Sequence, residues 1–194
     1  MSAIKDELQL TEKEAIYYEL LVLRCRQGQK GAFEELIKMW EERLFYYIRR
    51  IVDDENDAWQ ILQESWVKVL RSIRKLREPR KLPAWLYGIA RHTAISHLRY
   101  EYAKQSLLDN NENNYRDIGP DPLLRFDDVE QVHYGLGRLS LPHREVLTLF
   151  FLQDLSLEDI ALVLDIPVGT VKSRLYHAKR SLKNVLQGKE QRNE

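Results

Sequence analysis

The amino-acid sequence predicts an all-α protein with two small helical domains joined by a flexible linker. The C-terminal domain is expected to contain a helix-turn-helix. Apolar residues recur at three- and four-residue spacing along most of the 194 residues, with no alternating strand pattern. A stretch rich in Asp, Asn, Gly and Pro predicts the linker at residues 106–128. Near the C-terminus, two short helical patterns flank a tight turn, which indicates the helix-turn-helix.

The first domain is expected at residues 20–105, after an N-terminal extension of residues 1–19. Its helices are expected near residues 12–27, 30–52, 54–75 and 83–104. Pro83 suits the first turn of the fourth helix, where its missing N–H needs no partner. The buried stripe of that helix is predicted to contain Trp85, Leu86, Ile89, Ala90, Ala94 and Leu98.

The second domain is expected at residues 129–187, followed by a polar tail at 188–194. Its helices are expected near residues 126–137, 142–153, 156–164 and 168–187. Ser156 and Asp159 form a capping box for the third of these helices. Pro167 separates it from the fourth, because a proline disfavours helical backbone in the preceding residue. The fourth helix is predicted to bury Val171, Leu175, Ala178 and Leu182.

The other side of that last helix is strongly basic. Five Lys or Arg and no acid lie between Pro167 and Lys183. An ordinary surface helix with a solvated charged face could show the same pattern. The capped helix and the turn before it favour a helix that enters a DNA major groove.

The charges that cancel to a net charge of zero are unevenly placed along the chain. Residues 53–64 carry five acids and no base, whereas residues 71–104 carry nine bases and two acids. Acids at a helix N-terminus are stabilised by the helix dipole, but the addition of Gln63 and Glu64 favours a polar docking face. The basic segment can supply phosphate contacts, and flanking loops with exposed aromatics or cavities could hold unpaired bases.

Other classes of protein fit this sequence less well. Cys25 is the only cysteine, so no intrachain disulfide and no cysteine-based zinc site is expected. The five histidines lack metal-ligand spacing and no Gly-rich phosphate loop is present. We therefore expect no catalytic residues, no metal and no cofactor. The absence of a long apolar run or an apolar signal core predicts a cytoplasmic protein without membrane insertion.

Five short motifs carry a family resemblance. They are Arg24-Cys-Arg-Gln-Gly-Gln-Lys-Gly-Ala-Phe33, Leu62-Gln-Glu-Ser-Trp66, Trp85-Leu-Tyr-Gly-Ile-Ala-Arg91, Leu141-Pro-His-Arg-Glu-Val-Leu147 and Ile166-Pro-Val-Gly-Thr-Val-Lys-Ser-Arg-Leu175. The five motifs occur in the same order as in a known family. The chain resembles bacterial RNA polymerase sigma factors of the extracytoplasmic-function type, group 4 of the sigma-70 family. The resemblance spans roughly residues 20–105 and 130–187. It implies a protein that binds core RNA polymerase and directs initiation at promoters.

The resemblance also implies a role for each charged surface. The first domain would dock on the clamp of the largest polymerase subunit, and the second on the flap of the second-largest. The implied clamp-binding residues are Asp57, Gln60, Gln63 and Glu64. Those implied for recognising and melting the −10 element are Arg80, Lys81, Tyr87, Arg91, His92 and Arg99. Those implied for the −35 element are Thr170, Lys172, Ser173, Arg174, His177, Lys179 and Arg180.

The chain departs from the family pattern at several of these positions. Trp59-Gln60 stands where Glu-Asp is usual, and His92 where asparagine is common. Ser96 stands where aspartate is common, and His177 where arginine is frequent. The resemblance further implies control by an anti-sigma factor. The alternative functions are a helix-turn-helix regulator that works without polymerase and an enzyme acting on nucleic acid.

Overall fold

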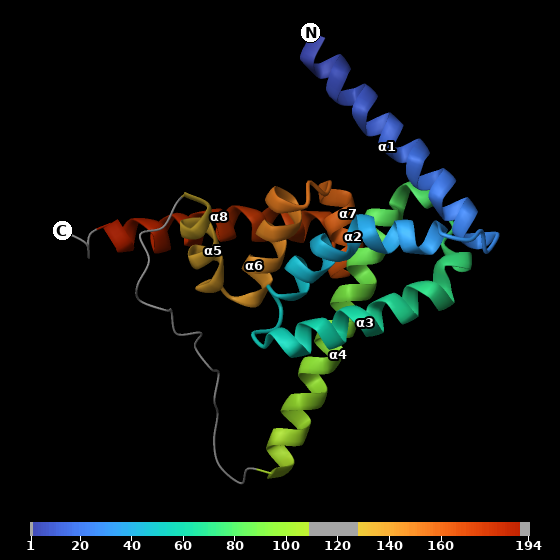
Figure 1. Ribbon diagram of the computed structural model, residues 1–194. Helices are drawn as coiled ribbons and strands as arrows, with labels where there is room; N and C mark the ends of the chain where they lie inside the picture. The colour runs from blue at the N-terminus through green and yellow to red at the C-terminus, as the bar shows by residue number, and fades with distance from the viewer. Residues whose placement is uncertain (1, 109–127, 191–194) are drawn as a thin grey trace.

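A computed structural model describes residues 2–108 and 128–190, with side chains at 12–104 and 131–187. All regular structure in these ranges is helical, as the fold class predicted (Figure 1). The linker expected at 106–128 and the tail expected at 188–194 fall largely outside the described residues. The helices are α1 (Ser2–Arg26), α2 (Ala32–Ile48), α3 (Glu55–Ser72), η1 (Ile73–Lys75), η2 (Pro79–Lys81), α4 (Leu82–Leu108), α5 (Asp128–Gly137), α6 (Leu141–Leu147), η3 (Thr148–Leu152), α7 (Leu157–Leu164) and α8 (Val168–Glu190).

In the first domain, α2, α3 and α4 pack on one another around buried apolar side chains. Gly31 has a φ of 83°, a left-handed conformation that glycine adopts freely, and it lets the chain turn into α2. Asp54 caps α3 by accepting a 3.0 Å hydrogen bond from the backbone N–H of Asp57. The apolar spacing predicted from the sequence is visible on α2, whose buried residues are Ala32, Leu36, Trp40, Leu44, Tyr47 and Ile48.

The first helix is continuous across the expected end of the N-terminal extension. Its N-terminal half projects away from the other helices, and its C-terminal half packs beside α2 (Figure 1). Leu21 and Val22 are fully buried there. Arg24 forms an ion pair of 2.8 Å with Glu35 of α2, which joins the two helices at this end. The same α1 segment contacts η2, the turn that leads into α4.

The second domain contains the predicted helix-turn-helix in α7 and α8. Ser156 caps α7 as expected, accepting a 3.1 Å hydrogen bond from the backbone N–H of Asp159. Asp165 ends α7 in the left-handed conformation, and α8 begins directly after Pro167. The helix expected at 142–153 instead changes character after Leu147, because the last turns, η3, are π-helical. This wider turn leaves Phe151 and Leu152 exposed.

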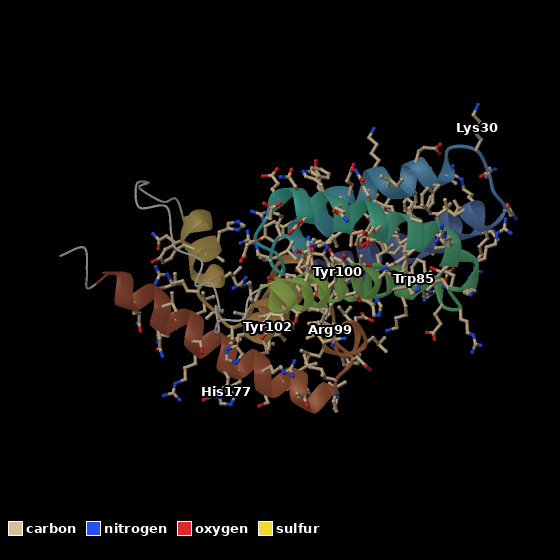
Figure 2. All side chains as sticks on the ribbon, turned by 90° about the horizontal axis from the view of Figure 1, so that it is seen from below. Lys30, Trp85, Arg99, Tyr100, Tyr102 and His177 are labelled. Carbon is tan, nitrogen blue, oxygen red and sulfur yellow. The ribbon has the colours of Figure 1, made fainter. Side chains whose placement is uncertain are left out.

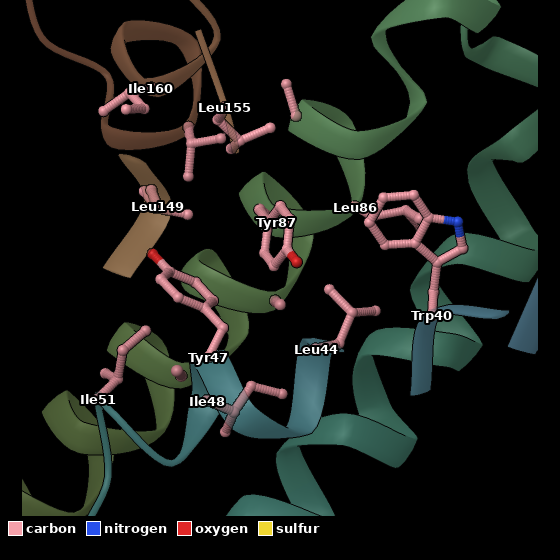
Figure 3. Packing of buried hydrophobic residues seen from close by; sticks show 14 of the residues in the cluster. Trp40, Leu44, Tyr47, Ile48, Ile51, Leu86, Tyr87, Leu149, Leu155 and Ile160 are labelled. Carbon is pink, nitrogen blue, oxygen red and sulfur yellow. The ribbon is translucent and has the colours of Figure 1, made fainter. Parts of the chain in front are cut away.

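The two domains pack against each other through a shared apolar core. α7 lies against α4, and the buried residues of both domains form one continuous cluster. Figure 3 shows Tyr47 and Tyr87 of the first domain beside Leu149 and Leu155 of the second. The packing of the two domains therefore buries apolar side chains that would be exposed to solvent if only the linker joined the domains.

Candidate nucleic-acid interface

The basic face of α8 is presented to solvent. Val171, Leu175 and Ala178 are buried, which confirms the predicted apolar side of this helix. On the opposite side, Lys172 and Ser173 are exposed in the first turns. The other predicted contact residues that are exposed are His177, Lys179 and Arg180, whereas Thr170 and Arg174 are half-buried. A helix with this face outward has the shape and charge to enter a DNA major groove.

Lys179 has neighbours that the sequence did not indicate. Its ammonium lies 4.9 Å from the ring centre of Phe151 and 5.5 Å from that of Phe150. Both rings belong to the π-helical segment, which places them against α8. The contact attracts the cation to the negative faces of the rings and orients a side chain predicted to bind phosphate.

The predicted −10 residues of the first domain differ widely in exposure. Arg80, His92 and Arg99 are exposed, and Figure 2 shows Arg99 on the outer part of α4. Lys81 and Arg91 are half-buried. The expectation that Tyr87 lies off the buried stripe is wrong, because its side chain is only 1% exposed.

Tyr87 is part of the core between the domains. Its ring makes edge-on contacts with Trp40 and Tyr47, at centroid distances of 5.9 and 5.3 Å. Its hydroxyl donates a hydrogen bond to Gln153 of the second domain. Burial raises the pKa of this phenol well above its usual range, so it remains a neutral donor. A buried ring of this kind cannot stack on a base unless the domains separate.

A cleft lies where the sequence predicted core. Trp85 and Ile89 were expected in the buried stripe of α4, but both are half-buried and line a cleft of about 450 Å³ together with His92. Lys68 of α3 and Leu162 of α7 close its other sides. The walls combine an indole, an apolar floor and basic groups, which suits a flat, partly polar ring such as a nucleobase.

Three basic side chains of the predicted −10 set are paired with acids, and one of them, Lys81, also lines this cleft. Arg80 Nε lies 2.7 Å from Glu19 in α1. The other two pairs join the domains and are Lys81 with Asp159 and Arg91 with Glu145, each at 2.8 Å. The hydrogen bond to Asp159 raises the pKa of Lys81, so this ammonium stays charged. These pairs could not be seen in the sequence, because their partners lie far along the chain.

The acidic helix α3 presents the predicted polar face. Gln60, Gln63 and Glu64 are exposed, and Gln60 donates a 3.3 Å hydrogen bond to Glu64. Asp57 is half-buried. Trp59, at the position of a usual family acid, is 40% exposed and stacks on Phe45 with a 4.1 Å centroid distance. The face is thus polar at one side and aromatic at the other.

Two sequence profiles of known families match the two domains. Sigma-70 region 2 matches residues 36–103, and Sigma-70, region 4 matches residues 130–182. Together with the exposed helix-turn-helix and the all-helical fold, these matches define a sigma factor of the sigma-70 family.

Curated relatives refine this class. The RNA polymerase sigma-H factor of Pseudomonas aeruginosa is 32% identical over 178 residues, covering 86% of this chain and 92% of the relative. The ECF RNA polymerase sigma-E factor of Haemophilus influenzae is 31% identical over 185 residues, covering 90% of this chain and 97% of the relative. The chain belongs to the extracytoplasmic-function sigma factors of the sigma-70 family and acts in transcription initiation.

Solved structures share the fold at lower identity. The sigma factor RpoE from Bartonella quintana, in complex with the anti-sigma factor NepR, aligns with a TM-score of 0.68 and 22% identity. That alignment covers 81% of this chain and 98% of the other. CnrH, in complex with the cytosolic domain of CnrY, aligns with a TM-score of 0.65 and 22% identity, over 87% and 96% of the two chains. Within residues 2–108 and 128–190, no helix is long and apolar enough to cross a membrane.

Proposed function

We propose that this sigma factor binds core RNA polymerase in the cytoplasm and divides promoter recognition between its two domains. In this proposal α8 reads the −35 element, α4 and the cleft beside it read and open the −10 element, and α3 docks on polymerase. The observation that carries the proposal is the exposed basic face of α8, which stands outward on a capped helix-turn-helix. The protein contributes binding energy and needs no catalytic group of its own.

Contacts to −35 DNA divide by chemistry. Lys172, Ser173 and His177 lie on the exposed face of the N-terminal half of α8 and are assigned to base edges. The remaining predicted residues of the helix-turn-helix are assigned to phosphates and are Thr170, Arg174, Lys179 and Arg180. Phosphate contacts fix the register of the helix, and base contacts select the sequence.

The cleft beside α4 is assigned to an unstacked base of the −10 element. Trp85 offers a face for stacking, and His92 offers a ring nitrogen for hydrogen bonding. Arg80 and Arg99, both exposed, are placed to neutralise the adjoining phosphates. Lys81 and Arg91 are assigned to the same strand, whereas the burial of Tyr87 gives it a packing role unless the domains separate.

The exposed face of α3 is assigned to the clamp of the largest polymerase subunit, and the second domain to the flap of the second-largest. Glu64→Lys should reduce the affinity for core polymerase by at least about tenfold, because it places a like charge against a basic partner. Glu34→Lys makes the same change of charge at an exposed position of α2 outside this face, and it is the matched control. Binding of the −35 duplex by the free chain should stay unchanged in both. Equal core affinity of the Glu64 variant and the wild type would refute this docking assignment.

An anti-sigma factor is the proposed regulator. Support comes from RpoE and CnrH, which are similar in fold and were solved in complex with NepR and with the cytosolic domain of CnrY. The surfaces assigned to DNA and to polymerase would be covered in such a complex. An acidic partner would complement α4 and α8.

Run-off transcription from a promoter library tests the whole proposal. With core polymerase, the protein should give specific initiation, and the enriched templates should share two elements at a fixed spacing. A regulator that works without polymerase would bind duplex DNA strongly and leave transcription by core polymerase unchanged. That second result would refute the proposed function.

A further inference from the structure

An exposed aromatic pair lies at the start of the acidic helix, outside the surfaces assigned to DNA. Trp59 of α3 stacks on Phe45 of α2, with ring centres 4.1 Å apart and an angle of 27° between the ring planes. The short connection after α2 brings the start of α3 beside the end of α2 (Figure 1). Phe45 is half-buried, whereas Trp59 is 40% exposed. A large part of the indole is therefore open to solvent on a ring that Phe45 holds in place.

The core of the first domain does not require an indole at this position. The side of α3 that faces the core is complete without it, since the buried residues of the helix are Ala58, Ile61, Leu62, Ser65, Trp66 and Val69. Tryptophan is among the residues that most often dominate the affinity of a protein–protein interface. A ring that is already held in place also loses little conformational freedom when a partner binds. The exposed indole therefore has the properties of a binding anchor.

Carboxylates flank the aromatic pair on both helices. Glu41 lies four residues before Phe45 in α2, and Glu55 lies four residues before Trp59 in α3. Each acid is therefore about one helical turn from a ring. Within the part of the chain that the structure describes, neither acid belongs to an ion pair. The surface thus combines a π-face with two carboxylates that can still take a cation.

An arginine of a partner suits this surface best. A guanidinium is planar, so it can stack on the indole while its N–H groups donate to a carboxylate beside it. A lysine ammonium lacks the planar group, and an apolar side chain would cover the carboxylates without pairing them. An acidic partner or a nucleic acid is disfavoured by the charges of Glu41 and Glu55.

We propose that Trp59 is the anchor by which this chain binds core RNA polymerase, and that an arginine of the clamp stacks on it. The inference rests on the proposed function for the clamp as partner, and adds the residue and the chemistry of the contact. Trp59 lies one turn before Gln63, an exposed residue of the face assigned to the clamp, so both meet the same partner. The stacked ring takes the place of the acids that the family usually has at Trp59-Gln60.

This exchange changes how core binding responds to salt. Attraction between exposed charges weakens as salt is added, because counterions screen it. The burial of an indole against a guanidinium depends much less on salt, since apolar contact and a desolvated cation are screened little. The contact of Trp59 with polymerase therefore persists at an ionic strength that weakens a contact made by exposed acids.

Substitutions of Trp59 separate the contributions of the ring. Trp59→Ala removes it, Trp59→Tyr keeps a π-face, and Trp59→Leu keeps apolar area without one. Leu20→Ala is the matched control, because Leu20 is an apolar residue of α1 that is 51% exposed and lies outside this face. Affinity for core polymerase is measured by competition with an end-labelled wild-type chain, at low and at high ionic strength. Circular dichroism of each free chain checks that its fold is intact.

The anchor predicts that Trp59→Ala binds core polymerase about thirtyfold more weakly than wild type, the loss expected when a dominant interface residue is removed. Trp59→Tyr should stay within about threefold of wild type, and Trp59→Leu should lose about tenfold because a guanidinium cannot stack on it. Leu20→Ala should bind as wild type does. The double variant Trp59→Glu with Gln60→Asp, which has the usual family acids, should lose more affinity than wild type as ionic strength rises.

Two results would overturn the anchor. Equal affinity of folded Trp59→Ala and of wild type would show that the indole does not contact polymerase. Wild-type affinity of Trp59→Leu would show that an apolar group, rather than an arginine, meets this position. Where Trp59→Ala is unfolded, the comparison of Trp59→Tyr with Trp59→Leu decides, because both keep an apolar side chain over Phe45. Failure of the proposed function would look different, since the wild-type chain itself would then have no affinity for core polymerase.

Discussion

Arg144 offers the most direct test of how the second domain is held together. Its guanidinium donates hydrogen bonds to four backbone carbonyls, at 3.0 to 3.1 Å. Those of Leu136 and Gly137 belong to the last turn of α5, that of Leu139 to the connection between α5 and α6, and that of Arg50 to the first domain. Burial lowers the pKa of this guanidinium, in keeping with a group that has lost part of its water. Arg144→Lys keeps the charge but removes the planar set of donors.

The magnitude follows from the number of bonds lost. A hydrogen bond in a protein contributes about 0.5–1.5 kcal/mol net, and an ammonium placed here could keep one or two of the four. With partial compensation by water at this half-buried site, Arg144→Lys should lower the free energy of unfolding by about 2 kcal/mol. The assay is urea denaturation of the full chain followed by circular dichroism. Arg138→Lys is the control, since Arg138 is exposed and lysine retains its contact with the Tyr134 ring. A change below about 0.5 kcal/mol for Arg144→Lys would refute this reasoning.

Two further substitutions probe packing and pH dependence. At Gly135, an added Cβ would lie 2.6 Å from a terminal carbon of the Leu182 side chain. Gly135→Ala should therefore lower the thermal midpoint of unfolding, although alanine favours helix more than glycine does. A higher midpoint would show that the Leu182 side chain moves aside at little cost. The second substitution concerns Glu35, which accepts a hydrogen bond from Tyr17 and pairs with Arg24. These contacts lower the pKa of the Glu35 carboxyl from its usual value. A lowered pKa stabilises the fold above the unfolded-state pKa, and the effect is lost as pH falls through the folded-state value. The difference in thermal midpoint between wild type and Glu35→Gln should therefore shrink below about pH 4, and a constant difference would contradict the assignment.

Local signals in the sequence were sufficient for the helices of the C-terminal domain. Ser156, Asp159 and Pro167 act on neighbours within a few residues, so their effect on the ends of α7 and α8 could be predicted. The apolar face of α8 was also predicted, because residues such as Val171 recur at helical spacing. The exposed face then follows from geometry, which is why the candidate −35 residues on it could be proposed from sequence.

The orientation of α4 could not be predicted in the same way. Its residues are apolar or aromatic on more than one side, and helical spacing alone does not say which side meets which partner. Tyr87 is buried because the second domain covers it, and Trp85 is half-buried because the cleft lies in front of it. Gln153, which accepts the hydrogen bond from Tyr87, and Leu162, which lines the cleft with Trp85, are dozens of positions away along the chain. Periodicity contains no information on such contacts.

The placement of charge along the chain has a different meaning in the folded protein. Separate blocks of acids and bases suggested separate external partners for each surface. In the structure, bases of the first domain meet acids of the second, as Arg91 meets Glu145. A net charge of zero is therefore compatible with an exposed basic face on α8, because part of the negative charge is paired with bases inside the protein.

Asp159 shows how one side chain can serve the local fold and the interdomain contact together. One of its carboxylate oxygens lies 2.7 Å from the Ser156 hydroxyl at the start of α7, and the other accepts from Lys81 at 2.8 Å. The capping pattern accounts fully for an acid at this position, so the sequence gives no reason to seek a second partner. A substitution at Asp159 would alter the cap and the interdomain contact at once. Glu145, by contrast, accepts its hydrogen bonds from Tyr47 and Arg91 of the other domain, so a substitution there alters the contact between the domains without altering the cap of α7.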